Sequence, residues 1–443
     1  MSSEWQSVRL GDCCFKIGSG ATPKGGKESY LDSGAFRLIR SQNVYNDGFH
    51  PSGLAFIGED QARKLEGVSV EASDILLNIT GDSVARVCLA PPQYLPARVN
   101  QHVAIIRPDP KVLDSRFLRY FLVSPQQQDF LLGLAAAGAT RNALTKGMIE
   151  DLCVPCPDIA IQKIIADSLS GLDDRITLLR ETNATLEAIA QALFKSWFVD
   201  FDPVHAKQEG RIPEGMDEAV AALFPDSFQE SGLGLVPKGW QTRPLYSIAT
   251  YVNGAAYKKF EPNLERRGLP IIKIAELKAG VTAQTAFSDV AMPEKYRIEH
   301  GDILFSWSGN PDTSIDTFVW HHGNSWLNQH IFRVIPNQAE EKSFVLQTLK
   351  YLRPVFAELA RNKQTTGLGH VTVADLKALH VVRPDQPLLE FFNETISSVH
   401  AAIFENTNQT LTLSEIRDTL LPRLISGKLR LPDADAELEV MAS

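Results

Sequence analysis

Ten residues near the start of the chain recur almost unchanged near its end. Residues 99–108 read VNQHVAIIRP and residues 327–336 read LNQHIFRVIP, 228 positions apart. The same offset joins residues 73–77 (SDILL) to residues 301–305 (GDILF), and it drifts to 235 near the N-terminus. A period of about 20–50 residues would indicate a solenoid or a propeller. The much longer period predicts a duplicated half-protein, with two copies of one plan in 443 residues.

Each copy closes with a long heptad pattern, in which apolar residues recur at alternating steps of four and three. Such a pattern predicts two helices of about 33 residues, roughly 50 Å long. The polar positions Asn183 and Thr410 fall near the middle of the two seams, where a polar residue typically fixes the register. We expect the helices to pack on each other, because a helix of this length overhangs a domain of about 150 residues. The constant offset of 227 between the seams and their central polar positions favour an antiparallel arrangement. The alternative is that each packs on its own globular part. The seam residues are Ile165, Leu169, Leu172, Ile176, Leu179, Asn183, Leu186, Leu193, Phe392, Ile396, Val399, Ile403, Thr410, Leu413 and Leu420.

The segments before the helices predict mixed α and β structure. Short apolar runs such as residues 36–39, 74–77 and 102–106 lie between Gly, Pro and Asn clusters, which is typical of strands. The predicted fold class is therefore α+β, with two mixed α/β domains separated by two long antiparallel helices. The expected segments are a globular domain at 1–157, a helix at 158–200, a connector at 201–238, a second globular domain at 239–385, a helix at 386–428 and a tail at 429–443.

Charge is distributed unevenly along the chain. The total of −9 at first argues against a nucleic-acid partner. The globular segments, however, are neutral to basic: residues 1–150 carry +1 and residues 238–384 carry +5. The acidic excess lies in the helix and connector segments, with −9 over residues 151–237 and −6 over residues 385–443. The sequence thus joins two domains that could meet DNA to two acidic helical segments.

Each candidate catalytic or metal-binding motif in the sequence lacks residues that its chemistry requires. Residues 18–28 (GSGATPKGGKE) resemble a phosphate-binding loop, but Ala21 and Glu28 stand where that motif needs Gly and Ser or Thr. Cys153 and Cys156 have metal-ligand spacing without a second cysteine pair. The five sparse cysteines, the absence of a signal-peptide pattern in MSSEWQSVRL and the lack of an apolar run near 18 residues favour a cytoplasmic protein with reduced thiols.

The paired blocks carry a family resemblance. WQSVRLGD and GWQTRPL open the halves, SDILLNITGD and GDILFSWSGN follow, the Asn-Gln-His turns come next, and LFKSWFVDFDPVHAK closes the first helix. Over its full length the chain resembles the specificity subunit of type I restriction–modification systems. The resemblance implies a non-catalytic subunit whose two target-recognition domains bind a bipartite, asymmetric site in double-stranded DNA. It also implies that the helices dock two methyltransferase subunits.

The same resemblance implies restriction/translocase subunits in the full complex, and S-adenosylmethionine, ATP and Mg on partner subunits alone. Two rival readings remain: a self-contained methyltransferase or nuclease, and a duplicated adaptor or anti-restriction protein without direct DNA readout.

Residues that read different half-sites should differ between the halves. The identical turns at 100–102 and 328–330 therefore favour a structural or phosphate-contacting role over base readout. Better candidates for DNA contact are polar or basic residues in loops. These are Lys24, Lys27, Arg40, Gln42, Asn43, Arg86, Arg98, Arg141, Asn142, Lys258, Lys259, Lys273, Trp307, Asn310, Lys363, Gln364, Thr365 and His370.

Overall fold

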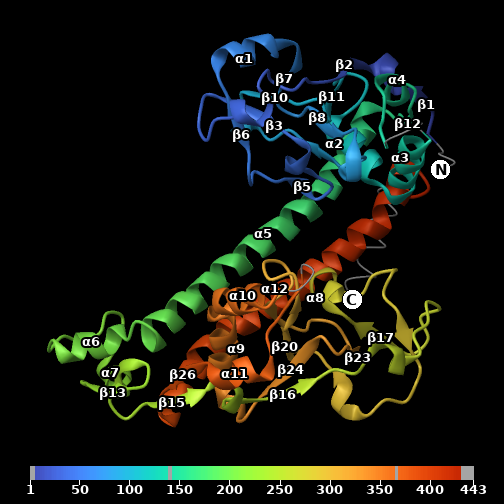
Figure 1. The fold of residues 1–443 in the computed structure, drawn as a ribbon. Coiled ribbons are helices and arrows are strands. Elements are labelled where there is room, and N and C mark those ends of the chain that lie inside the picture. The colour runs from blue at the N-terminus through green and yellow to red at the C-terminus, as the bar shows by residue number, and fades with distance from the viewer. Residues whose placement is uncertain (1–4, 138–141, 365–367, 431–443) are drawn as a thin grey trace. The chain divides into compact units, whose positions relative to one another are not determined.

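The computed structural model describes residues 5–137, 142–364 and 368–430 (Figure 1). The chain divides into two compact units. Unit 1 comprises Met1–Thr177 and Thr410–Ser443, and unit 2 comprises Leu178–Gln409. The boundaries fall inside the two long helices, α5 (Ile159–Phe198) and α12 (Gln386–Ser426), so each unit contains part of both.

Unit 1 contains two four-stranded sheets. The first is antiparallel, in the order β2 (Cys14–Ser19), β11 (Val103–Pro108), β8 (Ile75–Asn78), β9 (Val87–Leu89). The second has the order β6 (Ala55–Ile57), β3 (Phe36–Ile39), β10 (Ala97–Val99), β7 (Ser69–Val70), with β10 and β3 parallel. Smaller pairs join β1 (Ser7–Arg9) to β12 (Cys153–Pro155) and β4 (Val44–Tyr45) to β5 (Gly48–Phe49). The helices are α1 (Glu59–Lys64), α2 (Ser115–Val123), α3 (Pro125–Ala136) and α4 (Lys146–Glu150).

Unit 2 repeats this plan. Its antiparallel sheet has the order β16 (Ala249–Asn253), β24 (Ile331–Pro336), β20 (Ile303–Ser306), β22 (Asp316–Val319). The second sheet has the order β18 (Phe287–Ser288), β17 (Leu269–Ile272), β23 (Ser325–Leu327), β19 (Arg297–Ile298), with β17 and β23 parallel. The terminal pair is β15 (Gln241–Pro244) with β26 (His380–Arg383), and β21 (Ser308–Gly309) pairs with β25 (Gly369–His370). The predicted internal duplication is confirmed.

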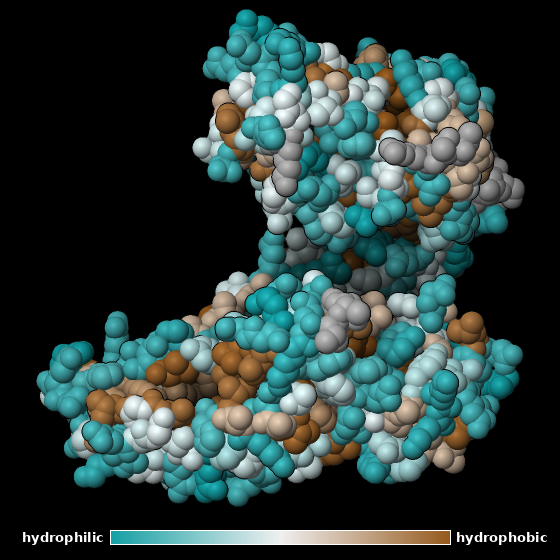
Figure 2. Space-filling view, viewed as in Figure 1, coloured by the Kyte–Doolittle hydropathy of each residue, from teal (hydrophilic) through white to brown (hydrophobic). Residues whose placement is uncertain are grey.

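The helices of unit 2 are α8 (Ile274–Ala279), α9 (Lys342–Tyr351), α10 (Arg353–Asn362) and α11 (Val373–Ala378). The connector forms α6 (Asp202–Gln208), α7 (Glu218–Ala222) and a hairpin of β13 (Phe228–Ser231) and β14 (Gly234–Pro237). Exposed apolar residues in this connector include Ile212, Leu233 and Leu235. Hydrophobic surface gathers over α6, α7 and β13 (Figure 2).

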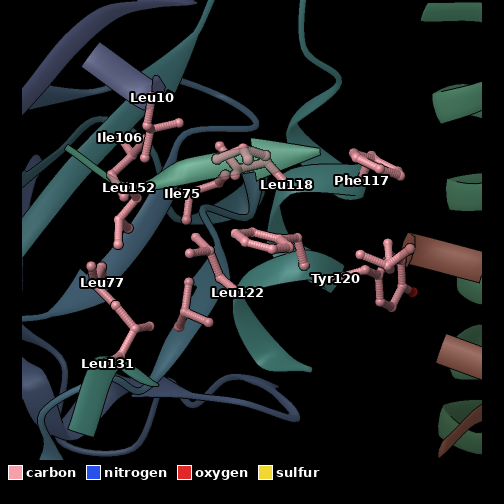
Figure 3. Packing of buried hydrophobic residues seen from close by; sticks show 14 of the residues in the cluster. Leu10, Ile75, Leu77, Ile106, Phe117, Leu118, Tyr120, Leu122, Leu131 and Leu152 are labelled. Atoms are coloured by element: carbon pink, nitrogen blue, oxygen red, sulfur yellow. The ribbon is translucent and has the colours of Figure 1, made fainter. Parts of the chain in front are cut away.

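The central strands are buried on both faces, which explains their continuous apolar sequences. All four residues of β8 and all four of β20 are buried. Within β8, Ile75 and Leu77 point into a core shared with α2, whereas Leu76 joins a separate core with β10. This alternation is the two-residue period of a strand. Figure 3 shows the first of these cores, with Leu10, Ile106 and Leu118 packed around Ile75.

The long helices pack on each other in an antiparallel sense, as predicted. In unit 2, Asn183 Nδ2 donates to the Ile403 carbonyl oxygen and to Thr407 Oγ1, both at 3.1 Å, and Asn183 Oδ1 accepts from Asn406 Nδ2 at 2.9 Å. In unit 1, Arg417 binds Asp173 at 2.8 Å. Residue numbers thus fall along α5 as they rise along α12. None of the predicted seam residues is exposed.

The long helices also pack on globular structure. The start of each lies in the core of the part that precedes it, as Leu169 and Phe392 do, and the C-terminal end lies in the core of the other unit. Ile416, Leu420 and Leu424 of α12 belong to the core of unit 1. Phe194 and Trp197 of α5 belong to the core of unit 2. The two alternatives drawn from the sequence therefore both hold, with one correction: each helix also covers the globular part of the other half. The expected segments ended where the long helices begin or end. The compact units instead divide within these helices, so the two sets of boundaries differ.

Candidate nucleic-acid interface

The repeated Asn-Gln-His turns close against a glycine in both units. Asn100 and Asn328 are buried, and Asn100 Oδ1 accepts from the backbone N–H of His102 at 3.0 Å. A Cβ atom on Gly20 would overlap the Val99 carbonyl oxygen, and one on Gly254 would overlap that of Asn328. Only glycine permits this approach of the backbones. The asparagine of each repeated turn is therefore a structural residue.

A second pair of segments meets beside each turn with the same hydrogen bond. In unit 1 the backbone N–H of Leu144 donates to the Ile79 carbonyl oxygen at 2.8 Å. In unit 2 the backbone N–H of Val371 donates to the Trp307 carbonyl oxygen at 2.8 Å. We call these places the equivalent corners. They comprise residues 79–80, 100–102 and 142–144 in unit 1 and residues 307–309, 328–330 and 369–371 in unit 2.

The two corners present different side chains from this shared frame. In unit 2 the Trp307 ring lies 5.7 Å from His330 and 5.8 Å from His370, and Trp307 Nε1 donates to Asn253 Oδ1 at 3.1 Å. His370 Nδ1 lies 2.9 Å from Ser308 Oγ. In unit 1 the places of Trp307 and His370 in the repeat are taken by Ile79 and Ala143. There His102 Nδ1 lies 2.5 Å from Thr80 Oγ1.

The surroundings of His330 in the corner of unit 2 disfavour the charged form of its imidazole. Burial, and then the neighbouring His370, lowers the pKa of His330. Its Nδ1 atom is buried without a hydrogen-bond partner. A neutral imidazole and an indole can stack on a base or bond its edge without a charge. Trp307 and His370, predicted separately, are thus brought together, whereas Asn310 lies exposed at the end of β21.

Aromatic rings lie against two of the predicted arginines of unit 1, Arg40 and Arg86. Arg40 lies over Tyr30 at 5.3 Å and bonds the Gly53 carbonyl oxygen, which also accepts from Gln42 at 3.2 Å. Arg86 lies over Tyr45 at 4.5 Å. Gln42 is exposed, and both guanidinium groups belong to half-buried residues. These contacts restrict the conformations of the two arginine side chains.

Two of the predicted DNA contacts do not fit their surroundings. Asn43 is fully buried and donates to the carbonyl oxygens of His50 and Ser52 at 2.9 and 3.3 Å. Arg98 is 8% exposed and donates to the carbonyl oxygens of Ala62 and Ala97. Burial lowers the pKa of Arg98. Because backbone oxygens already occupy both side chains, we assign them a structural role.

The remaining candidates are scattered over exposed loops and helix ends. Lys24, Lys258 and Lys259 are exposed, as are Asn142, Lys363 and Gln364. Lys273 lies 5.3 Å from the centre of the Tyr257 ring, and Lys363 is paired with Asp375. Arg141, Thr365 and the side chain of Lys27 lie outside the described residues.

Sequence reasoning missed the residues that position these groups. Tyr30, Tyr45 and Asn253 hold Arg40, Arg86 and Trp307 through contacts between distant segments, which no local pattern reveals. Only Asn253 had a usable signal, since it precedes Gly254 as Ser19 precedes Gly20. Within the described ranges, no group of three or more His, Cys, Asp or Glu residues is placed to hold a metal ion, and no helix is both long and apolar enough to span a membrane.

Comparison with known proteins agrees with this architecture. The family model described as type I restriction modification DNA specificity domain matches residues 2–188 and 237–408. The HindI specificity subunit of Haemophilus influenzae is 25% identical and aligns with 96% of this chain and 100% of its own length. The EcoKI specificity subunit of Escherichia coli K12 is also 25% identical, over 90% of this chain and 84% of its own.

The fold is similar to that of the S subunit of a type I restriction–modification system from M. genitalium. The TM-score is 0.54 at 19% identity, and 96% of each chain is covered. Specificity subunits of these systems are non-catalytic, as predicted for this chain. The duplicated fold and the two matched segments together show that the chain belongs to the family of type I restriction–modification specificity subunits.

Proposed function

We propose that this chain binds a bipartite, asymmetric site in double-stranded DNA, with one half-site for each globular domain. The observation that carries the proposal is the pair of equivalent corners, in which one backbone frame presents different side chains. Unit 2 offers Trp307 and His370 where unit 1 has Ile79 and Ala143, whereas His330 and His102 are common to both. Because the chemistry differs, the half-sites should differ in sequence. Exposed lysines such as Lys24, Lys258 and Lys259 supply phosphate contacts.

We further propose that two methyltransferase subunits dock on the long helices. Residues 151–237 carry −9 and residues 385–443 carry −6, which disfavours direct DNA contact. The outer face of α5 carries Ile164, Leu178 and Ile189, each exposed by 51–52%. Apolar side chains among acidic ones suit a protein partner better than DNA. The assembled enzyme would add restriction/translocase subunits and work in the cytoplasm. S-adenosylmethionine, ATP and Mg would bind to the partner subunits.

The proposal is tested by methylation mapping with the variant His370→Ala. Cells that carry this chain and its methyltransferase are expected to lose specificity at one or two positions of one half-site, by about 1–3 kcal/mol per lost base contact. The other half-site should be unchanged. His380→Ala, an exposed histidine on β26, is the matched control. A His370→Ala motif identical to that of the wild type, or changed in both halves, would contradict the assignment.

A further inference from the structure

Unit 2 contains a cavity of about 600 Å³ that the DNA-binding proposal does not use. Its walls come from α8, α9 and α12, from β22 and from Glu187 of α5. Ligand sites of proteins typically enclose about 300–1,000 Å³ and combine an apolar lining with a few convergent polar groups. Most of the lining here is apolar, including Leu277, Phe318, Leu346 and Phe404.

The polar groups on the wall carry one uncompensated charge. Lys350 Nζ is paired with Glu187 Oε2 at 2.5 Å. Lys342, which also lines the cavity, forms no ion pair among the described residues. Burial lowers the pKa values of His321 and His400 to about 4, so both imidazoles are neutral near pH 7. The cavity therefore carries a net positive charge from Lys342.

Two buried polar atoms on the same wall lack hydrogen-bond partners. They are Glu187 Oε1 and His321 Nδ1. Buried polar atoms are nearly always hydrogen-bonded, so each exception calls for a partner that the chain does not supply. His400, by contrast, is satisfied, because its ring nitrogens face Ser343 Oγ at 3.4 Å and Gln347 Nε2 at 2.8 Å.

We propose that this cavity binds a small monoanionic molecule with an aromatic or aliphatic body. Its anionic group would pair with Lys342, its body would lie against Leu346 and Phe404, and a donor group would reach Glu187 Oε1. The ligand would thereby touch α5, α9 and α12 at once.

The corresponding place in unit 1 has a different chemistry. A cavity of about 370 Å³ lies there, with Asp173 at the position that His400 takes in unit 2. Both arginines on its wall are paired, Arg116 with Asp167 and Arg119 with Asp173. Since no cation is left over on this wall, we assign the anion site to unit 2 alone.

The test compares 6-hydroxynaphthalene-2-sulfonate, whose hydroxyl supplies the donor, with the neutral 6-hydroxynaphthalene-2-sulfonamide by calorimetry on the full-length chain. The sulfonate should bind at one site per chain, roughly fivefold more tightly than the sulfonamide, as expected for one partly exposed ion pair. Lys342→Gln should abolish this difference and leave sulfonamide binding unchanged. Lys295→Gln, which removes an exposed lysine outside the cavity wall, should behave as wild type.

A second variant locates the site without touching a charge. Ala401 lines the cavity from an exposed position of α12, so Ala401→Trp should fill the space and retain the fold. Binding of both probes should be lost at an unchanged melting temperature. The proposal is overturned if neither probe binds saturably, if the two bind equally, or if Lys342→Gln or Ala401→Trp binds the sulfonate as wild type does.

Discussion

At the scale of single residues, identity between the two halves predicted the role of a residue better than its polar or basic side chain did. The identical Asn100 and Asn328 predicted a shared role, and their burial beside Gly20 and Gly254 gives that role a steric basis. Asn43 was selected as a polar loop residue, yet it lies buried because residues 50–52 fold back over it. One sequence does not reveal such a contact, since it depends on the path of a loop.

Two partly buried histidines, His321 and His400, should make the stability of unit 2 depend on pH. Burial, with a smaller contribution from Lys350, lowers the pKa of His400 from 6.5 to about 4, and His321 is shifted to about 4 by burial and by the adjacent His300. Between pH 6.5 and about 4, these two imidazoles bind protons in the unfolded chain and remain neutral in the folded chain. The stability is therefore fully present above pH 6.5 and falls as the pH is lowered towards 4.

We expect His400→Gln to flatten this dependence. Each histidine contributes at most about 1.4 kcal/mol per pH unit, less for the part that remains in contact with water. Calorimetric unfolding between pH 4.5 and 7.5 measures the slope. His380→Gln, at an exposed position, should keep the wild-type slope. An unchanged slope in His400→Gln would show that the imidazole is protonated at no cost in the folded chain.

At the scale of elements, the sequence predicted which segments form helices and strands and missed how they combine. The apolar run at 36–39 is β3 as expected, but its parallel pairing with β10 joins residues about 60 positions apart. The heptad seams predicted mutual packing of α5 and α12. They could not predict what covers the helix ends, because a heptad pattern shows which face of a helix is apolar and not which part of the protein packs against it.

The end of α12 should stabilise unit 1, although it lies more than 400 residues from Leu10 along the chain. Leu420 is 3% exposed in that core, whereas Leu411 on the same helix is 39% exposed. Leu420→Asp buries an unpaired charge and should cost at least about 3 kcal/mol. Hydrogen exchange should show the loss of protection in β8 and β11, with Leu411→Asp as the control. Loss confined to unit 2 would refute this packing.

Two neighbouring leucines on α5 allow the effect of a substitution on folding to be distinguished from its effect on partner docking. Leu179 is 4% exposed in the seam and Leu178 is 52% exposed on the outer face. We expect Leu179→Asp to lower the melting temperature, because it places a charge between the helices. Leu178→Asp should melt as wild type but weaken co-purification of the methyltransferase. If Leu178→Asp binds the partner normally, this face of α5 is not the docking surface.

At the scale of the whole molecule, the duplication was evident from the sequence, and the interlacing of the two halves was not. Each compact unit takes its globular part from one half and a helix end from the other. A chimera that exchanges residues 1–157 alone would place foreign strands against the native end of α12. The exchangeable piece is residues 1–177 together with 410–430, which keeps each core from one parent.

Methylation mapping of this chimera tests the central claim most directly. Residues 1–177 and 410–430 would come from a relative with a different recognition sequence, and residues 178–409 from this chain. The account predicts a methylated motif with one half-site from each parent, and the reciprocal chimera should give the complementary combination. A motif that follows one parent in both halves would contradict the account.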